Sequence, residues 1–177
     1  MNIWSVGHGA RPLEEFIALL RAADIGALAD VRLLPGSRRH PHFGAESLEA
    51  SLREIGIAYV HLPELGGRRE PRADSPHRAL RVAAFRGYAD HMSTEEFARG
   101  YGRLTLLARE SRTAFMCAET LWWRCHRRLI ADRLTLDGWT VTHLFAPGKS
   151  EPHVLWDAAR IDDGHLVYDV GALPLPT

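Results

Sequence analysis

One recurring pattern organises the sequence: a short apolar run, a loop, an amphipathic stretch and a glycine. Residues 3–6 form the first apolar run, and 13–20 then carry apolar side chains at intervals of three and four, the spacing of one helix face. Gly26 ends this unit, and 27–31 begins the next as a buried strand. Strands that alternate with helices predict an α/β fold with a mostly parallel sheet.

The rest of the chain continues this alternation. The expected helices are 48–55, 77–91 with an interruption at Gly87, 93–108 and 122–136, and the expected strands are 57–62, 113–117, 139–145 and 166–170. Right-handed crossovers place helices on both faces of the sheet, so we expect a three-layer, single-domain architecture over 1–177. Segment 146–165 lacks a clear period, which makes 146–177 a candidate extension that wraps an edge of the sheet.

Composition narrows the classes of partner. The 177 residues fit one domain. The 22 basic and 22 acidic side chains balance, whereas a dedicated duplex DNA binder usually carries a basic excess. No apolar run approaches the ~18 residues of a membrane span, and the first residues lead into a strand rather than a secretory signal. We therefore expect a cytoplasmic protein without a membrane partner, whose two cysteines stay reduced.

Ionisable side chains come directly after nearly every expected strand. They are His8, Asp30, Arg32, His61, Cys117, Glu119 and His143. In a parallel sheet the carboxyl ends of the strands share one edge, and ligands bind there. This coincidence points to a functional site at that edge. The alternative is that these groups pair with one another and cap helices.

The most informative motif is CAETLWWRCHR at 117–127, which leads from a strand end through a turn into an expected helix. Cys117 would face the helix amino terminus, which favours a nucleophilic thiolate. Glu119 is a candidate acid or base, because a carboxylate above a buried strand is costly unless it is paired or used. Arg127 is a candidate anion clamp, and Cys125, about one turn into the helix, would lie beneath the same pocket. Alternatively, both cysteines are ordinary core residues.

A metal site is a second interpretation of this motif. Its candidate ligands are Cys117, Cys125 and His126 with one of His8, His61 and His143. The spacing is not C-x-x-C, and neighbours on a helix point about 100° apart, which would separate Cys125 from His126. We therefore assign Cys125 and His126 to substrate binding and assign no metal ligand from the sequence.

Two loops carry further candidate binding groups. Segment 35–43 reads PGSRRHPHF, in which Ser37 and Arg38 could hold a phosphate or carboxylate. Loops of this kind in compact domains are often functional, although charged runs are commonly plain solvated surface. Gly66 and Gly67 precede two arginines and permit close backbone approach to a ligand, or else form a simple turn.

Several motifs occur in order along the chain. They are VGH at 6–8, DVR at 30–32, SRR at 37–39 with Phe43 after it, YVHLPELGG at 59–67, FRGYADHM at 85–92, and CAE with CHRRLIADRL within 117–134. Together they resemble a bacterial family known as domain of unknown function 488, over roughly 3–170. The resemblance implies an α/β domain and supplies no activity. The family commonly has serine after Gly-His, whereas this chain has Gly9, so a hydroxyl there is not essential.

These observations favour an enzyme that acts on a small anionic substrate, nucleotide-like, phosphorylated or carboxylated. Glu119 and Asp30 would serve as acid and base, Cys117 as nucleophile, and the arginines, Arg32 among them, as anion clamp. His8 and His61 would orient groups or relay protons. The alternatives are a single-stranded nucleic-acid module, a Cys/His metal-binding or redox protein, and a scaffold without chemistry. The sequence specifies neither a cofactor nor an oligomeric state.

Overall fold

A six-stranded sheet forms the centre of the protein, whose computed structural model describes residues 1–36 and 39–172. In sheet order the strands are β3 (Ala58–His61), β2 (Ala27–Asp30), β4 (Thr113–Cys117), β1 (Asn2–Gly7), β5 (Thr140–Ala146) and β6 (Lys149–Pro152). The first five run parallel, and β6 pairs antiparallel with β5. The predicted mostly parallel sheet is confirmed, and the carboxyl ends of its parallel strands share one edge.

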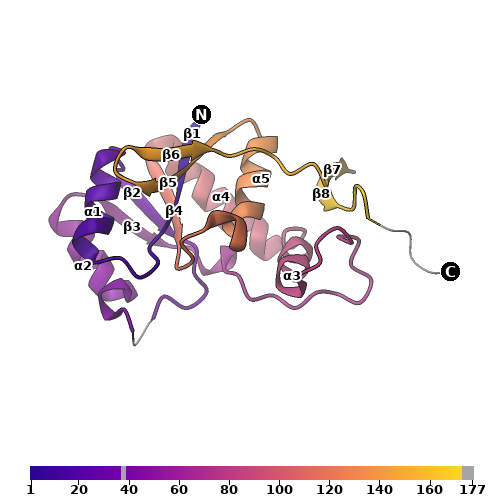
Figure 1. Ribbon diagram of the computed structural model, residues 1–177, viewed down its shortest axis with the longest axis horizontal. Coiled ribbons are helices and arrows are strands. Elements are labelled where there is room, and N and C mark those ends of the chain that lie inside the picture. Colours follow the sequence, from indigo (N-terminus) through magenta and orange to yellow (C-terminus); the bar gives the residue numbers. More distant parts are fainter. Residues whose placement is uncertain (37–38, 173–177) are drawn as a thin grey trace.

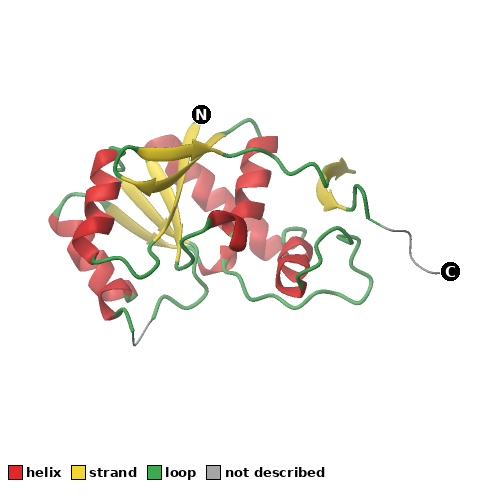
Figure 2. Ribbon diagram, viewed as in Figure 1, coloured by secondary structure: helices red, strands yellow, loops and turns green. Residues whose placement is uncertain are grey.

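Helices lie on both faces of the sheet, as predicted (Figure 1). On one face are α1 (Leu13–Ala22) and α2 (Ala45–Glu54), and on the other are α3 (Ala83–His91), α4 (Glu95–Glu110) and α5 (Arg127–Leu136). Side chains alternate between the faces along each strand. Phe115 of β4 packs in the core with α4 and α5, whereas its neighbours Ala114 and Met116 pack with α1 and α2. Figure 2 shows the resulting three layers.

The helix expected at 77–91 forms only in its second part, as α3, and passes through Gly87 without a break. The first part is not helical, and the N–H of Ala79 donates to the carbonyl of Tyr168 at 2.9 Å. Gly87 does not break the helix and instead allows close packing. A Cβ at this position would collide with the backbone of Arg69, so glycine lets the loop after β3 lie against α3.

The helix expected at 122–136 is split. Its first part is the 3-10 turn η3 (Trp122–Arg124), Cys125 is extended with φ −128° and ψ 150°, and α5 begins shortly after it. The ring of Trp122 stacks on His143 of β5 with centroids 4.1 Å apart, so a tertiary contact overrides the helical pattern. The expectation that Cys125 lies one turn into a helix is therefore wrong.

Beyond β5, the strand expected at 166–170 forms as β8 (His165–Tyr168), two residues shorter at its end and outside the main sheet, whereas β6 and β7 (Ala159–Asp162) were not expected. Within 146–165, β6 extends the edge of the sheet. β7 and β8 pair antiparallel as a separate two-stranded sheet beside the helices (Figure 1). Leu166 and Tyr168 of β8 join the core on the α3 and α5 side. Only β6 of these strands therefore lies along the edge of the main sheet.

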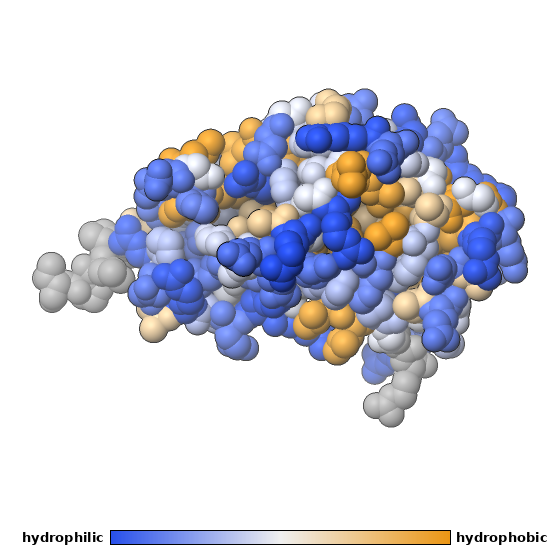
Figure 3. Space-filling view, turned by 180° about the vertical axis from the view of Figure 1, so that it is seen from behind, coloured by the Kyte–Doolittle hydropathy of each residue, from blue (hydrophilic) through white to orange (hydrophobic). Residues whose placement is uncertain are grey.

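The surface carries no large apolar area on the side opposite to Figure 1, where hydrophilic residues surround small separate apolar patches (Figure 3). Exposed apolar residues belong to different elements, such as Leu106 of α4 and Ile161 of β7. Single exposed residues of this kind are ordinary. Among the described residues, no helix has both the length and the apolar character that crossing a bilayer requires.

Candidate functional site

The carboxyl edge of the sheet gathers the predicted site residues into two groups. His8, Asp30 and Arg32 lie at the ends of β1 and β2 and form the Asp–Arg cluster. Cys117, Cys125 and His126 lie at the end of β4 and before α5 and form the Cys–His cluster. The two groups differ in how far their polar atoms are already used within the protein.

The guanidinium of Arg32 donates its hydrogen bonds to groups within or next to the Asp–Arg cluster. Its Nε donates to Asp30 Oδ1 at 2.9 Å, and one terminal nitrogen donates to Asp30 Oδ2 at 2.5 Å and to the carbonyl of Phe43 at 2.9 Å. The hydroxyl of Tyr59 donates to the same carboxylate at 2.7 Å. Asp30 and Arg32 are both buried. Arg32 is therefore an internal ion-pair partner rather than an open anion clamp.

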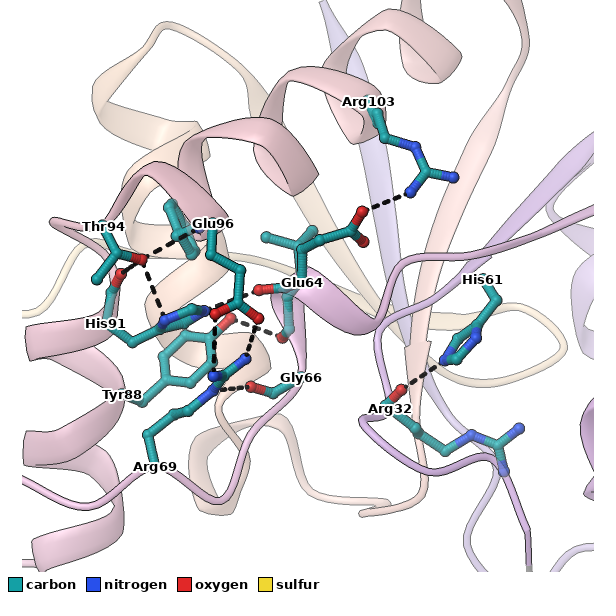
Figure 4. A network of polar contacts seen from close by, with 12 residues as sticks. Arg32, His61, Glu64, Gly66, Arg69, Tyr88, His91, Thr94, Glu96 and Arg103 are labelled. Carbon is teal, nitrogen blue, oxygen red and sulfur yellow. Dashed lines mark hydrogen bonds and ion pairs between the residues drawn. The ribbon is translucent and has the colours of Figure 1, made fainter.

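His8 stands against this pair as a neutral ring. Its Nδ1 donates to the carbonyl of Gly9 at 2.8 Å, which leaves Nε2 to accept from Arg32 at 3.3 Å. The ring stacks on Phe43 with centroids 4.1 Å apart. Burial, and then the charge of Arg32, lower the pKa of His8 to about 4. His61 lies at the outer side of the cluster, where its Nε2 donates to the carbonyl of Arg32 at 2.9 Å (Figure 4).

The Cys–His cluster brings two sulfurs and one imidazole nitrogen together. The Sγ atoms of Cys117 and Cys125 and the Nδ1 of His126 all lie within 4.8 Å of one another. Nδ1 is 3.6 Å from Cys125 Sγ and 4.0 Å from Cys117 Sγ. The Nε2–H of His126 donates to the carbonyl of Val31 at 3.1 Å, so in the neutral ring Nδ1 turns its lone pair toward the sulfurs.

The predicted glycines support this ring instead of facing an open cavity. A Cβ on Gly67 would lie 2.8 Å from His126 Nδ1, and a Cβ on Gly66 would lie 2.7 Å from Leu33 Cα. Tyr88 of α3 contacts the other side of the ring, with centroids 4.9 Å apart. The close backbone approach that the sequence suggested is therefore made to His126 and Leu33.

A polar network holds the glycine loop in place (Figure 4). The turn η2 (Pro63–Leu65) precedes the glycines, and the hydroxyl of Tyr88 donates to the carbonyl of Leu65 at 2.8 Å. His91 donates to the carbonyl of Glu64 at 2.8 Å, and Arg69 pairs with Glu96 of α4 at 2.9 Å. The motif FRGYADHM thus anchors the loop that positions His126.

The pKa values of the two thiols shift in opposite directions. The pKa of Cys125 lies well below the usual thiol value, because Cys117 donates to its sulfur and because His126 and Arg127 lie close by. The same contact, and then burial, raise the pKa of Cys117. Cys125 is 4% exposed, whereas Cys117 is half-buried and closer to solvent.

Arg127 is a buried cation beneath the turn after β4. It is 1% exposed, and it donates to Ser5 Oγ at 3.0 Å and to the carbonyls of Glu119 and Thr120. Its Nε has no partner, and no carboxylate pairs with it among the described residues. Arg127 therefore shapes the site and makes it electropositive, and it is not an open clamp.

Glu119 is exposed, so burial does not argue for its use. Its Oε1 accepts from the N–H of Leu121 at 3.3 Å, and the carboxylate remains accessible to solvent. Two other predicted binding residues, Ser37 and Arg38, lie outside the described residues.

The structure adds a buried relay that sequence reasoning missed. His153 Nε2 donates to Asp132 Oδ1 at 2.9 Å, and His143 Nε2 then donates to His153 Nδ1 at 2.9 Å. The hydroxyl of Tyr168 donates to the other carboxylate oxygen of Asp132, Oδ2, at 2.8 Å. His143 thus points to α5 and is not brought to the Cys–His cluster. A polar Asp132 on an otherwise apolar helix face was the available signal.

A zinc ion fits the Cys–His cluster. Zinc–sulfur bonds of about 2.3 Å and zinc–nitrogen bonds of about 2.1 Å place sulfur and nitrogen about 3.6 Å apart at tetrahedral angles, close to the observed 3.6 and 4.0 Å. Metal-binding histidines usually donate their other ring N–H to a carbonyl or carboxylate, as His126 does to Val31. The expectation that Cys125 and His126 diverge on a helix is wrong, because both precede α5.

The substitution Gly9→Ser tests the departure from the family motif. Gly9 has φ +56°, and a Cβ there would collide with Thr120 Oγ1. We expect the free energy of unfolding to fall by about 1–2 kcal/mol in urea denaturation. Gly9→Ser with Thr120→Ala should recover the part due to the collision. Gly102→Ser on α4, where the space is open, is the matched control, and an equal loss there would contradict the explanation.

Comparisons with known proteins agree with the motifs. The family model of the Domain of unknown function DUF488 matches residues 12–134. No curated protein matches the chain, and no solved structure matches it.

Proposed function

We propose that this chain, which belongs to the Domain of unknown function DUF488 family, is an enzyme that binds a zinc ion or a similar transition-metal ion and uses it to activate water. The observation that carries the proposal is the Cys–His cluster, whose ligand atoms lie within 4.8 Å of one another around an oriented imidazole. Cys117, Cys125 and His126 would hold the ion with three protein ligands, the number found in catalytic zinc sites. Cys117 is half-buried, so an ion held here would lie near solvent.

The proposed reaction is a hydrolysis. When bound, the metal would supply a polarised water as the nucleophile, and the protein would supply a base that takes a proton from this water and returns it to the leaving group. Glu119 is the candidate base, because it is an exposed carboxylate two residues after Cys117. In other zinc enzymes a glutamate that is not a ligand plays this part. The charge of Arg127 favours the small anionic substrate that the sequence suggests.

Metal content tests the site directly. After expression with added zinc and reducing purification, we expect about one zinc ion per chain by plasma mass spectrometry. His126→Asn and Cys117→Ser should lose most of the zinc. His165→Asn, which changes an exposed histidine of β8, should keep it. A wild-type chain that carries no metal would overturn the metal role.

Turnover tests the enzyme. A panel of phosphate and carboxylate esters, beginning with p-nitrophenyl phosphate and p-nitrophenyl acetate, should be hydrolysed by the zinc-loaded chain. EDTA should remove this activity and zinc should restore it. Glu119→Gln should retain zinc and lose about a hundredfold or more in turnover, the usual contribution of a general base. A zinc-loaded chain that hydrolyses no member of the panel would sink the proposal.

A thiol-dependent enzyme is the second candidate, and the pKa shifts of the cysteine pair favour it. A cysteine whose pKa lies below the usual thiol value, beside a histidine, is the arrangement of a nucleophilic cysteine. The two functions separate by alkylation with iodoacetamide. Zinc should protect Cys117 if the metal is native, whereas a metal-free chain whose activity disappears on alkylation would establish the thiol enzyme instead.

A further inference from the structure

A second hollow lies away from both clusters, on the side of the sheet that α3 and α5 cover. It has a volume of about 640 Å³ and lies between segment 78–82, the start of α3, the start of α5 and segment 156–172. We call it the arginine cavity. Its size is that of sites for drug-sized ligands, about 300–1,000 Å³.

The charged residues that line the cavity are all arginines. Arg78 and Arg81 line it from the segment before α3, and Arg128 lines it from the first turn of α5. No aspartate or glutamate stands among the described residues that line it. Guanidinium groups bind phosphate and carboxylate through paired hydrogen bonds, so this arrangement selects an anion.

The remaining wall is apolar and in part aromatic. Phe85, Leu80 and Trp156 line the same cavity. The guanidinium of Arg128 lies 4.3 Å from the ring centre of Trp156. A planar cation stacked on an indole forms a platform that also accepts a flat ring of a ligand. The cavity therefore combines a place for a flat ring with groups for an anion.

Backbone hydrogen bonds fix the walls relative to one another. The N–H of Ala79 donates to the carbonyl of Tyr168 at 2.9 Å. The N–H of Val170 donates to the carbonyl of Ala158 at 3.2 Å. Tyr168 is fully buried and bonded to Asp132 of α5. The cavity is thus preformed, which reduces the entropy lost on binding.

We propose that the arginine cavity binds a small molecule that carries a flat ring and a phosphate or carboxylate group. Arg81 and Arg128 hold the anionic group, and Trp156 and Phe85 contact the ring. This site is separate from the Cys–His cluster, and its ligand binds with or without a metal there.

Isothermal titration calorimetry tests the proposal with probes that carry the flat ring and the anionic group either together or separately. AMP and 4-hydroxybenzoate carry a ring and an anion, adenosine carries the ring alone, and inorganic phosphate carries the anion alone. At least one of the first pair should bind about tenfold or more tighter than both single-feature probes. Preference for AMP would identify a phosphorylated ligand, and preference for 4-hydroxybenzoate a carboxylate. Equal binding of all four probes, or none, overturns the proposal.

Variants place the binding in the cavity. Arg128→Gln and Arg81→Gln should each weaken the preferred probe by about tenfold or more. Arg21→Gln on α1, an exposed arginine outside the cavity, should leave affinity unchanged. Arg81 is exposed, so its replacement tests the site even if Arg128→Gln misfolds, which a thermal melt would reveal. The titrations are repeated after EDTA treatment. Affinity unchanged by both variants contradicts the assignment, whatever the outcome for the metal site.

Discussion

Arg32→Met is expected to lower the free energy of unfolding by about 3–5 kcal/mol in urea denaturation near neutral pH, the usual loss when one partner of a buried ion pair is removed. Asp30 is fully buried, and without the guanidinium its carboxylate keeps, among the described residues, only the Tyr59 hydroxyl and one backbone N–H. The contacts of Arg32 with Phe43 and His8 would be lost as well. The variant therefore leaves an uncompensated buried charge at the edge of the sheet.

The double variant Asp30→Asn with Arg32→Met is the control. It buries no charge, so it should recover a substantial part of the loss. Arg53→Met on the exposed side of α2 should change stability by less than about 0.5 kcal/mol. If Arg32 served as an open anion clamp instead, the single variant would lose less than about 1 kcal/mol and the double variant would be no more stable. That result would restore Arg32 as a ligand-binding residue.

The sheet was predictable because apolar runs mark its strands and glycines mark the helix ends, and neither signal depends on tertiary contacts. Thr113–Cys117 is a strand with the predicted bounds, and the other predicted parallel strands differ by a residue or so at their ends. The position of Asp30, Arg32 and Cys117 at the strand ends was enough to place all three at one edge. The topological argument needs no side-chain geometry, since parallel strands present their carboxyl ends together.

Roles within the edge were harder to predict, because they depend on which partner each polar atom finds. Sequence spacing cannot show that Arg32 turns back onto Asp30, or that Gly67 packs on an imidazole. The break before α5 is decided by the contact of Trp122 with His143, far away in the sequence. A helical pattern over 122–136 therefore concealed the approach of Cys125 to His126, the geometry on which the metal proposal rests.

The surroundings of the Cys–His cluster explain why so many polar groups at the carboxyl edge of the sheet bond to one another. Val31 and Gly67 fix the ring of His126 from two elements, and the Asp–Arg pair fixes the end of β2, directly before Val31. The proposed metal site requires ligands held in a fixed geometry, which hydrogen bonds from neighbouring groups provide. The Asp–Arg cluster is then the support of the Cys–His cluster.

Acid is expected to destabilise the protein through His143. Burial first, then His153 and Arg127, lower the pKa of His143 to about 2. Below about pH 6.5 the imidazole binds a proton in the unfolded chain, where its pKa is near 6.5, but stays neutral in the folded one. The free energy of unfolding therefore falls as the pH drops below about 6.5. Two pH units correspond to about 2.7 kcal/mol, which is about the loss expected from this residue between about pH 7 and about pH 4.5. The groups that face the ring are His153, Arg127 and, through His153, Asp132.

His143→Gln isolates this contribution, because a glutamine amide can still donate to His153 but does not titrate. Urea denaturation near pH 7 and near pH 4.5 should show a drop in unfolding free energy smaller by about 2.7 kcal/mol than in the wild-type chain. His165→Gln, at an exposed histidine of β8, should keep the wild-type drop. The same drop in all three proteins would mean that carboxylates, rather than the buried imidazole, set the acid limit of this fold.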